Sequence, residues 1–328
     1  MLQLSTYNDR IHKEYLMKIL PNLKNRIKLG VRHNKTLHTL SHEAKSILLP
    51  NYNTTSEDDT TLKLLLISEP QKLIECNNEI WDKFTRLPDD SRPSKKLIEI
   101  IFNYNGVYNT NKENGYWLAK IIGRNTCVYC NRNYIFTVVD VNKAGNKGYI
   151  SRPVFDHCYT KSDYPMLSLS LYNLIPSCTV CNSSVKGTKS LHYVDYIHPY
   201  VKDPEASKFT FRATKKPSVK SEWTLAIDCE KGSKIDRTLS ELAIEQMYSQ
   251  HASLEVTDIM NFEEAYEDGY INTIVNKLFS DSKISLSKKD VYRMLFGVEY
   301  DSDKFLDRPF SKLKRDLLKQ IGLNDEFS

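Results

Sequence analysis

The stretch that decides the fold holds two close cysteine pairs, Cys127–Cys130 (CVYC) and Cys178–Cys181 (CTVC). Two residues between cysteines let both thiolates bind one ion, and two such pairs supply four soft ligands for a closed tetrahedral site. A disulfide framework is typical of short secreted chains, and iron–sulfur clusters usually use a tighter run of cysteines. The spacing predicts a structural zinc ion bound by Cys127, Cys130, Cys178 and Cys181.

Polar residues of another kind lie inside this frame. Asp156 and His157 are adjacent between the two pairs, and Asn182 directly follows the last cysteine. A closed four-cysteine site has no open position, so any chemistry must come from other residues. Asp and Asn offer hard oxygen ligands of the kind that Mg²⁺ prefers, and a near-neutral imidazole can accept a proton. The alternative is structural, with an acid in a turn and Asn182 capping a helix.

The residues between the pairs predict two strands and a helix. Residues 134–141 are rich in β-branched and aromatic side chains, residues 142–148 favour a turn, and residues 149–155 are predicted to return as the second strand. Asp156 and His157 are then expected at the end of this hairpin. Residues 158–174 indicate a long loop, and a short helix is predicted after Pro176, ending at a glycine cap, Gly187.

From about Thr126 to Gly187 the chain resembles the HNH nuclease superfamily, and within it the endonuclease VII-like members. The resemblance rests on three elements in the family's order: Asp156-His157, Tyr172-Asn173-Leu174 and Cys178–Asn182. It implies a ββα-metal fold, with a histidine on the hairpin and an asparagine or histidine on the helix. The chain departs from many members in having asparagine at the helix position, and its span from Cys130 to Asp156 is longer than in the most compact ones.

The resemblance also implies roles. Asp156 and Asn182 would bind one catalytic Mg²⁺ or Mn²⁺, His157 would activate the attacking water, and Asn173 would hold the loop and orient the imidazole. The implied activity is hydrolysis of DNA phosphodiester bonds. Two alternatives stay open: an RNase on the same site, for example one that cleaves transfer RNA, and a catalytically silent zinc-knuckle protein that binds nucleic acid.

Helical periodicity surrounds this core, so the predicted class is α+β: a zinc-knuckle ββα-metal HNH core with mostly helical flanks. The predicted regions are a helical N-terminal region (1–115), the nuclease core with zinc (116–200), and a basic hairpin with a helical C-terminal region (201–328). Pro21 is expected to kink or end the first helix, and Ser94 to begin another. The C-terminal helices are expected to pack against the N-terminal ones.

Positive charge is concentrated in one segment. The net charge is +5, and residues 208–220 contain five basic and no acidic side chains. Residues 209–212 and 223–227 alternate like a strand pair, so this predicted basic hairpin could contact a phosphate backbone. A solvated lysine loop is the alternative. The candidate nucleic-acid contacts are Lys186, Lys189, Lys208, Arg212, Lys215 and Lys216.

Other features narrow the function. The first residues lack a basic-then-apolar signal and no apolar run approaches the ~20 residues that span a bilayer, so a cytoplasmic protein without membrane contact is expected. The aromatic segment 191–200 is interpreted as a clasp on the core, while His33, His38 and His42 have no assigned role. No GxxxxGK[ST] phosphate loop occurs. The arrangement resembles nuclease subunits of Septu-like bacterial anti-phage systems, which implies a separate ATPase subunit as a partner.

Overall fold

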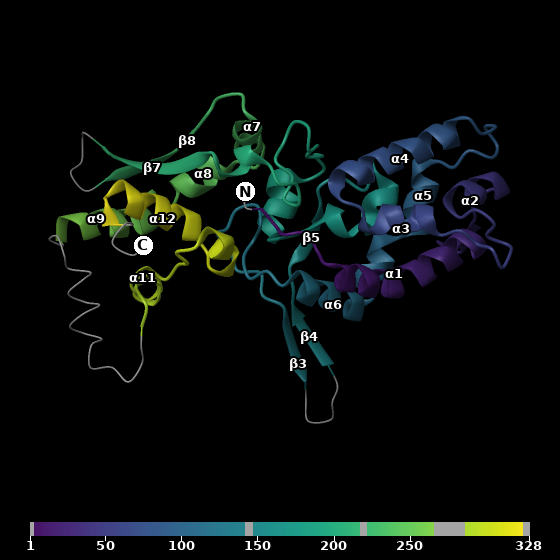
Figure 1. The fold of residues 1–328 in the computed structure, drawn as a ribbon, viewed down its shortest axis with the longest axis horizontal. Helices are drawn as coiled ribbons and strands as arrows, with labels where there is room; N and C mark the ends of the chain where they lie inside the picture. The colour runs from purple at the N-terminus through teal and green to yellow at the C-terminus, as the bar shows by residue number, and fades with distance from the viewer. Residues whose placement is uncertain (1–2, 142–146, 217–221, 266–285, 324–328) are drawn as a thin grey trace.

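The computed structural model describes residues 3–141, 147–216, 222–265 and 286–323. Helices and small antiparallel hairpins are mixed, as expected for an α+β protein. Figure 1 shows the helices of residues 9–122 gathered at one end of an elongated molecule. The described residues between 204 and 320 form the other end, and the segment with both cysteine pairs lies between the two ends.

The N-terminal helices surround a buried apolar core. Their bounds are α1 (Asp9–Leu29), α2 (His42–Leu48), α3 (Thr60–Ile67), α4 (Pro70–Thr85), α5 (Lys95–Phe102) and α6 (Lys112–Ile122), with a π-type turn at η1 (Asn105–Thr110). The helix start predicted at Ser94 is confirmed, because its hydroxyl accepts a hydrogen bond from Leu97 N at 3.1 Å. The helix end predicted as one outcome at Pro21 is wrong, because α1 continues through it to Leu29. Pro21 is exposed, so water can satisfy the carbonyl that lacks its helical donor.

A small hairpin follows α1. Strands β1 (Val31–His33) and β2 (Thr36–His38) pair antiparallel, with Val31 opposite His38. Asn34 and Lys35 form the turn, with φ of 49° and 66°. Positive φ at both central residues matches the right-handed twist of the strands. The hairpin packs beside α5, so Arg32 and His33 lie near residues 99–105.

The core strands differ from the predicted hairpin. Strands β3 (Val138–Val141) and β4 (Lys147–Ser151) pair as expected, but the predicted second strand breaks at Arg152-Pro153. Proline has no N–H for a sheet ladder, so the chain leaves one hairpin there and enters another. The new strand β5 (Val154–His157) pairs with β6 (Leu174–Ser177). Asp156 and His157 are therefore inside a strand pair rather than beyond the end of the first hairpin.

Between β5 and β6 the chain forms a buried loop with two short 3₁₀ turns, η2 (Pro165–Leu169) and η3 (Leu171–Asn173). The helix predicted after Pro176 is present as η4 (Val180–Lys186), a π-type segment. Gly187 ends it with φ of 55°, and its N–H donates to Asn182 O at 3.2 Å. The strand pair that precedes this helix is β5 and β6, not the predicted pair 134–141 and 149–155.

The C-terminal region forms around a two-stranded hairpin. Strands β7 (Phe209–Lys215) and β8 (Trp223–Cys229) pair as predicted. The helical elements are η5 (Pro204–Ser207), α7 (Lys234–Glu241), α8 (Ile244–Ser249), η6 (Ala252–Val256), α9 (Thr257–Ala265), α11 (Lys288–Phe296), η8 (Ser302–Asp307) and α12 (Ser311–Gln320).

The expected packing of these helices against the N-terminal helices is wrong. They lie at the opposite end of the molecule (Figure 1), and α8 and α12 pack chiefly on β7 and β8. The alternating strands turn one apolar face, with Phe211 and Leu225, toward them. The apolar side chains of α8 and α12 are therefore buried against this hairpin rather than against the N-terminal helices. Among the described residues no helix has the length and apolar character needed to cross a membrane.

Candidate functional site

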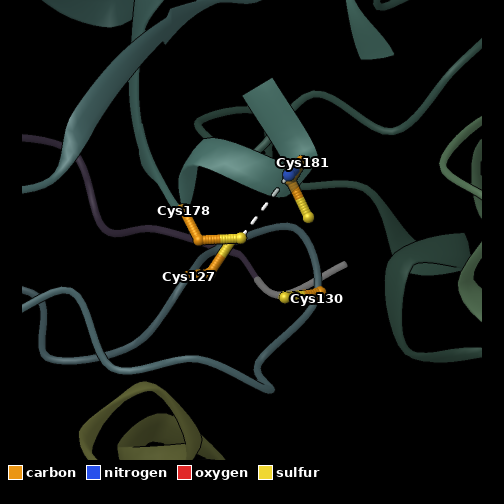
Figure 2. Close-up of side chains that lie close together, drawn as sticks. All are labelled: Cys127, Cys130, Cys178 and Cys181. Carbon is orange, nitrogen blue, oxygen red and sulfur yellow. Dashed lines mark hydrogen bonds between the residues drawn. The ribbon is translucent and has the colours of Figure 1, made fainter. Parts of the chain in front are cut away.

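The four paired cysteines meet at one point. Their sulfur atoms all lie within 4.8 Å of one another, and all four residues are buried. Figure 2 shows two segments converging: the first pair comes from the loop after α6, and the second from the end of β6 and the start of η4. The predicted grouping is confirmed.

Hydrogen-bond donors surround the sulfur atoms. Asn133 Nδ2 donates to Cys178 Sγ at 3.4 Å, and the backbone N–H of Cys181 donates to the same sulfur at 3.5 Å (Figure 2). The N–H of Arg132 donates to Cys130 Sγ at 3.5 Å. Hydrogen bonds from the neighbouring Cys127 also lower the pKa of the Cys178 thiol. Four soft donors at this spacing fit a structural zinc ion.

Contacts from the C-terminal region hold the first cysteine pair in place. Asn131 has φ of 48°, and its side-chain amide donates to Phe305 O at 2.8 Å and to Arg308 O at 3.1 Å. The hydroxyl of Tyr248 donates to Cys130 O at 2.6 Å. These bonds attach the loop to elements more than a hundred residues further along the chain.

Asp156 lies in the interior beside this cluster. Tyr129, between the first two cysteines, donates its hydroxyl to Asp156 Oδ2 at 2.6 Å. Lys186, at the end of η4, places its Nζ 3.1 Å from Oδ2 and 3.3 Å from Oδ1, and also donates to His157 O at 2.8 Å. Burial raises the pKa of Asp156, while Lys186 and Tyr129 act in the opposite direction.

The position of Lys186 corrects the expectation of a surface phosphate contact. Its side chain has no exposed surface, and its ammonium is committed to Asp156 and a backbone carbonyl. Sequence reasoning also missed Tyr129 and Lys186 as partners of Asp156. The sequence contains one indication of this contact. Tyr129 lies between Cys127 and Cys130, so its side chain must be near the residues that surround the cysteine cluster.

Asn182 does not meet Asp156 in the described residues. Its Nδ2 donates to Ser183 Oγ at 3.2 Å, and no hydrogen bond joins it to the carboxylate. Both oxygens of Asp156 already accept hydrogen bonds from Tyr129 or Lys186. This arrangement does not fit a divalent cation on Asp156, because the Lys186 ammonium lies where the cation's charge would be needed.

His157 is half-buried at the end of β5. Its Nε2 lies 3.0 Å from Ser168 O, and since a carbonyl only accepts, Nε2 carries the proton and Nδ1 is left as an acceptor. The ring of Tyr104 stands edge-on to the imidazole at 4.4 Å between centroids. Burial lowers the pKa of His157 to about 4, although the bond to Ser168 raises it. The imidazole is therefore neutral at pH 7.

Asn173 organises the loop that carries Ser168. It is fully buried, its Oδ1 accepts from Tyr159 N at 2.7 Å, and its Nδ2 donates to Tyr159 O at 3.0 Å and Leu167 O at 2.9 Å. No bond runs from Asn173 to the imidazole. It affects His157 only through the loop, whose Ser168 carbonyl fixes the ring.

Acidic partners accompany most of the remaining basic candidates. Arg212 pairs with Asp228 across β7 and β8, Lys216 Nζ lies 2.7 Å from Glu222, and Lys189 pairs with Glu241. The positive charge of residues 208–220 is thus partly offset by acidic side chains from other segments of the chain. Lys215 lies 5.6 Å from the Trp223 ring centroid, and Lys208 is exposed. Lys220 lies outside the described residues.

The aromatic segment 191–200 is a clasp, as interpreted. Leu191 N donates to Cys158 O at 2.9 Å, and Tyr200 OH donates to Leu174 O at 3.4 Å. His198 is buried, and burial lowers its pKa to about 3. Burial raises the pKa of the Cys158 thiol, so that cysteine is an inert filler.

No family model matches this chain, and no curated protein or solved structure matches it significantly.

Proposed function

We propose that this protein is an HNH-type nuclease that hydrolyses phosphodiester bonds of DNA. The observation that carries the proposal is His157. Its imidazole is neutral, its Nε2–H is fixed on Ser168 O at 3.0 Å, and its Nδ1 is free to accept a proton. It lies at the end of β5, in the order β5, β6, η4, and between the two cysteine pairs along the chain. A neutral imidazole whose orientation is fixed by a hydrogen bond is suited to general-base catalysis.

The proposed step uses the chain's own groups. His157 Nδ1 takes a proton from water as the water oxygen bonds to phosphorus, and the bond from phosphorus to the 3′ oxygen breaks. The departing oxygen is then protonated from solvent. Ser168 O holds the tautomer that makes Nδ1 the acceptor, and it stabilises the imidazolium that forms. Asn173 is a positioning residue, because it orders the loop that presents Ser168.

A catalytic Mg²⁺ or Mn²⁺ on Asp156 and Asn182 is the finer part of the proposal, and the described geometry does not favour it. The Lys186 ammonium, 3.1 Å from Asp156, would have to leave before a cation could bind there. No step above is assigned to a cation. Assays with and without added Mg²⁺ or Mn²⁺ decide whether the reaction needs one.

The test is a cleavage assay on plasmid DNA and total RNA, comparing wild type, His157→Ala and the control His198→Ala. Loss of a general base is expected to reduce cleavage by about 10²- to 10⁴-fold. His198 is also a buried histidine, but it is not bonded to the loop of Ser168. His198→Ala is expected to cut normally once melting shows that it is folded.

Three results would contradict parts of the proposal. Equal cutting by wild type and His157→Ala would remove His157 from the mechanism. Cleavage of RNA alone would replace DNA as the substrate. Binding without any cutting, in the presence of either cation, would favour a silent zinc-knuckle protein. A separate ATPase subunit is a further proposal, which co-purification with the tagged chain tests. A role in anti-phage defence is proposed together with that partner.

A further inference from the structure

A cavity of about 170 Å³ is lined by residues that contact His157, although His157 is not among its lining residues. Two of its lining residues are Tyr104 and Ser168, and both contact the imidazole. The β1–β2 hairpin contributes Arg32 and His33 to the lining. The N-terminal region thus shares a cavity with the residues that contact the proposed base.

The cavity has an excess of positive charge. Arg32 and Lys161 both line it, and neither has a hydrogen bond or ion pair from its side chain within the part of the chain that the structure describes. Lys96 and Glu99 also line it but neutralise each other, with Nζ and Oε2 2.9 Å apart. Two cationic side chains therefore remain available to an anion.

Ser168 provides a second, independent indication of a ligand. The residue is 1% exposed, and its hydroxyl has no hydrogen-bond partner. Buried hydroxyls are nearly always bonded, because leaving one unsatisfied is unfavourable. Its carbonyl is already bonded to His157, so the free hydroxyl belongs to the same residue that fixes the proposed base. An acceptor oxygen in the cavity would satisfy it.

The geometry points to a phosphate-binding site formed by Arg32, Lys161 and Ser168 for one phosphate group of a nucleic-acid strand. Guanidinium and ammonium groups bind phosphate oxygens through charge-assisted hydrogen bonds, and the hydroxyl donates a third. The volume equals that of roughly six waters, so it admits a phosphate group but not a stacked base pair. This inference rests on the proposed nuclease function: the bound phosphate would align the strand beside His157.

Binding of a fluorescein-labelled 20-nucleotide single strand, as DNA and as RNA, tests the site without added divalent cations. Fluorescence anisotropy would be compared for wild type, Arg32→Ala, Lys161→Ala and Ser168→Ala. Each variant is expected to weaken binding by about tenfold. For Arg32→Ala and for Lys161→Ala, the magnitude of the slope of log K against log salt concentration is expected to fall by about 1 relative to wild type.

Arg10→Ala is the matched control. Arg10 is an exposed arginine near the start of α1, and the hairpin follows the end of that helix, ~30 Å away along its axis. It is expected to bind like wild type. Ser168→Ala adds a further check: removing an unpartnered buried hydroxyl should leave the melting temperature of the free protein unchanged or raise it while binding weakens.

The outcomes separate this site from the proposed function. If wild type binds and cuts while Arg32→Ala and Lys161→Ala bind equally well, the site is overturned and the nuclease stands. If wild type neither binds nor cuts any strand, the nuclease proposal fails. Thermal shift with inorganic phosphate then decides: stabilisation of wild type but not of Arg32→Ala keeps a phosphate site for a free anion, and no stabilisation removes it.

Discussion

The cysteine cluster and the Asp156 site lie side by side, yet they satisfy their charges in opposite ways. The four sulfur atoms converge within 4.8 Å with only weak N–H donors around them and no cationic side chain among their hydrogen-bond partners. Asp156, in contrast, receives Lys186 and Tyr129 from the chain itself. Four thiolates in the first set would need an external cation, whereas the charge of Asp156 is neutralised by the fold. The need for a metal thus depends on what else the chain places beside the ligands.

Breaking the cysteine cluster is expected to have the largest effect. Cys178→Ser should lose zinc and unfold the central region, at a cost of more than ~5 kcal/mol, because binding energy and folding energy are shared in such sites. The measurement is zinc content by mass spectrometry together with a melting curve. Cys158→Ser is the matched control, since the thiol of that buried cysteine donates to Leu191 O and lies outside the cluster. Full zinc and native melting in Cys178→Ser would refute the zinc site.

Removing the internal cation from Asp156 should come next. Lys186→Met leaves a buried carboxylate unpaired, and the free energy of unfolding is expected to fall by about 3 kcal/mol. The control is Lys189→Met, because the Lys189 side chain is exposed and its pair with the half-buried Glu241 is open to solvent on the lysine side, with an expected change under ~1 kcal/mol. Denaturant unfolding measures both.

The same variant sharpens the comparison of the two sites. Mg²⁺ should raise the melting temperature of Lys186→Met more than that of wild type, because only the variant lacks a cation beside Asp156. An equal response would mean that Lys186 does not compete with a metal there.

The tyrosine contact to Asp156 is expected to contribute less. Tyr129→Phe removes one hydrogen bond to a charged, buried acceptor, at a cost of about 2 kcal/mol. Tyr108→Phe removes a 2.6 Å bond between neutral hydroxyls, and Tyr15 OH keeps Leu169 O as its acceptor, so ~1 kcal/mol is expected. Chemical denaturation of the pair would measure the difference. Equal losses would indicate that Asp156 is protonated in the folded protein.

His198 represents a third kind of buried site, with neither a metal nor a charged partner. Its folded pKa of about 3 lies below the unfolded value of about 6.5, so the unfolded chain takes up the proton first. Its contribution is complete above the unfolded pKa and is lost as the pH falls toward 3, by about 1 kcal/mol between pH 6.5 and 5.5. His198→Asn should remove that part of the slope in unfolding experiments at several pH values. An unchanged slope would mean that another group titrates.

Local patterns predicted much of this structure. The cysteine spacing, the Ser94 cap, the β7–β8 pair and the helix ending at Gly187 each depend on residues close in sequence. The failures involve distant partners. Residues 149–155 had the composition of one strand, but Pro153 divides it and β6 supplies the new partner. The acids that offset Arg212 and Lys189 also lie outside the basic run.

The sequence alone determined that the four cysteines would come together, because two residues between cysteines let both side chains of a pair face one point and bind one ion. Only the tertiary structure decided the state of Asp156 and His157. Lys186 is thirty residues from Asp156 and Ser168 eleven from His157, and no local rule links either pair. Burial makes these partners obligatory, since a charge or polar group removed from water must be compensated. Which group compensates it is set by how the segments pack.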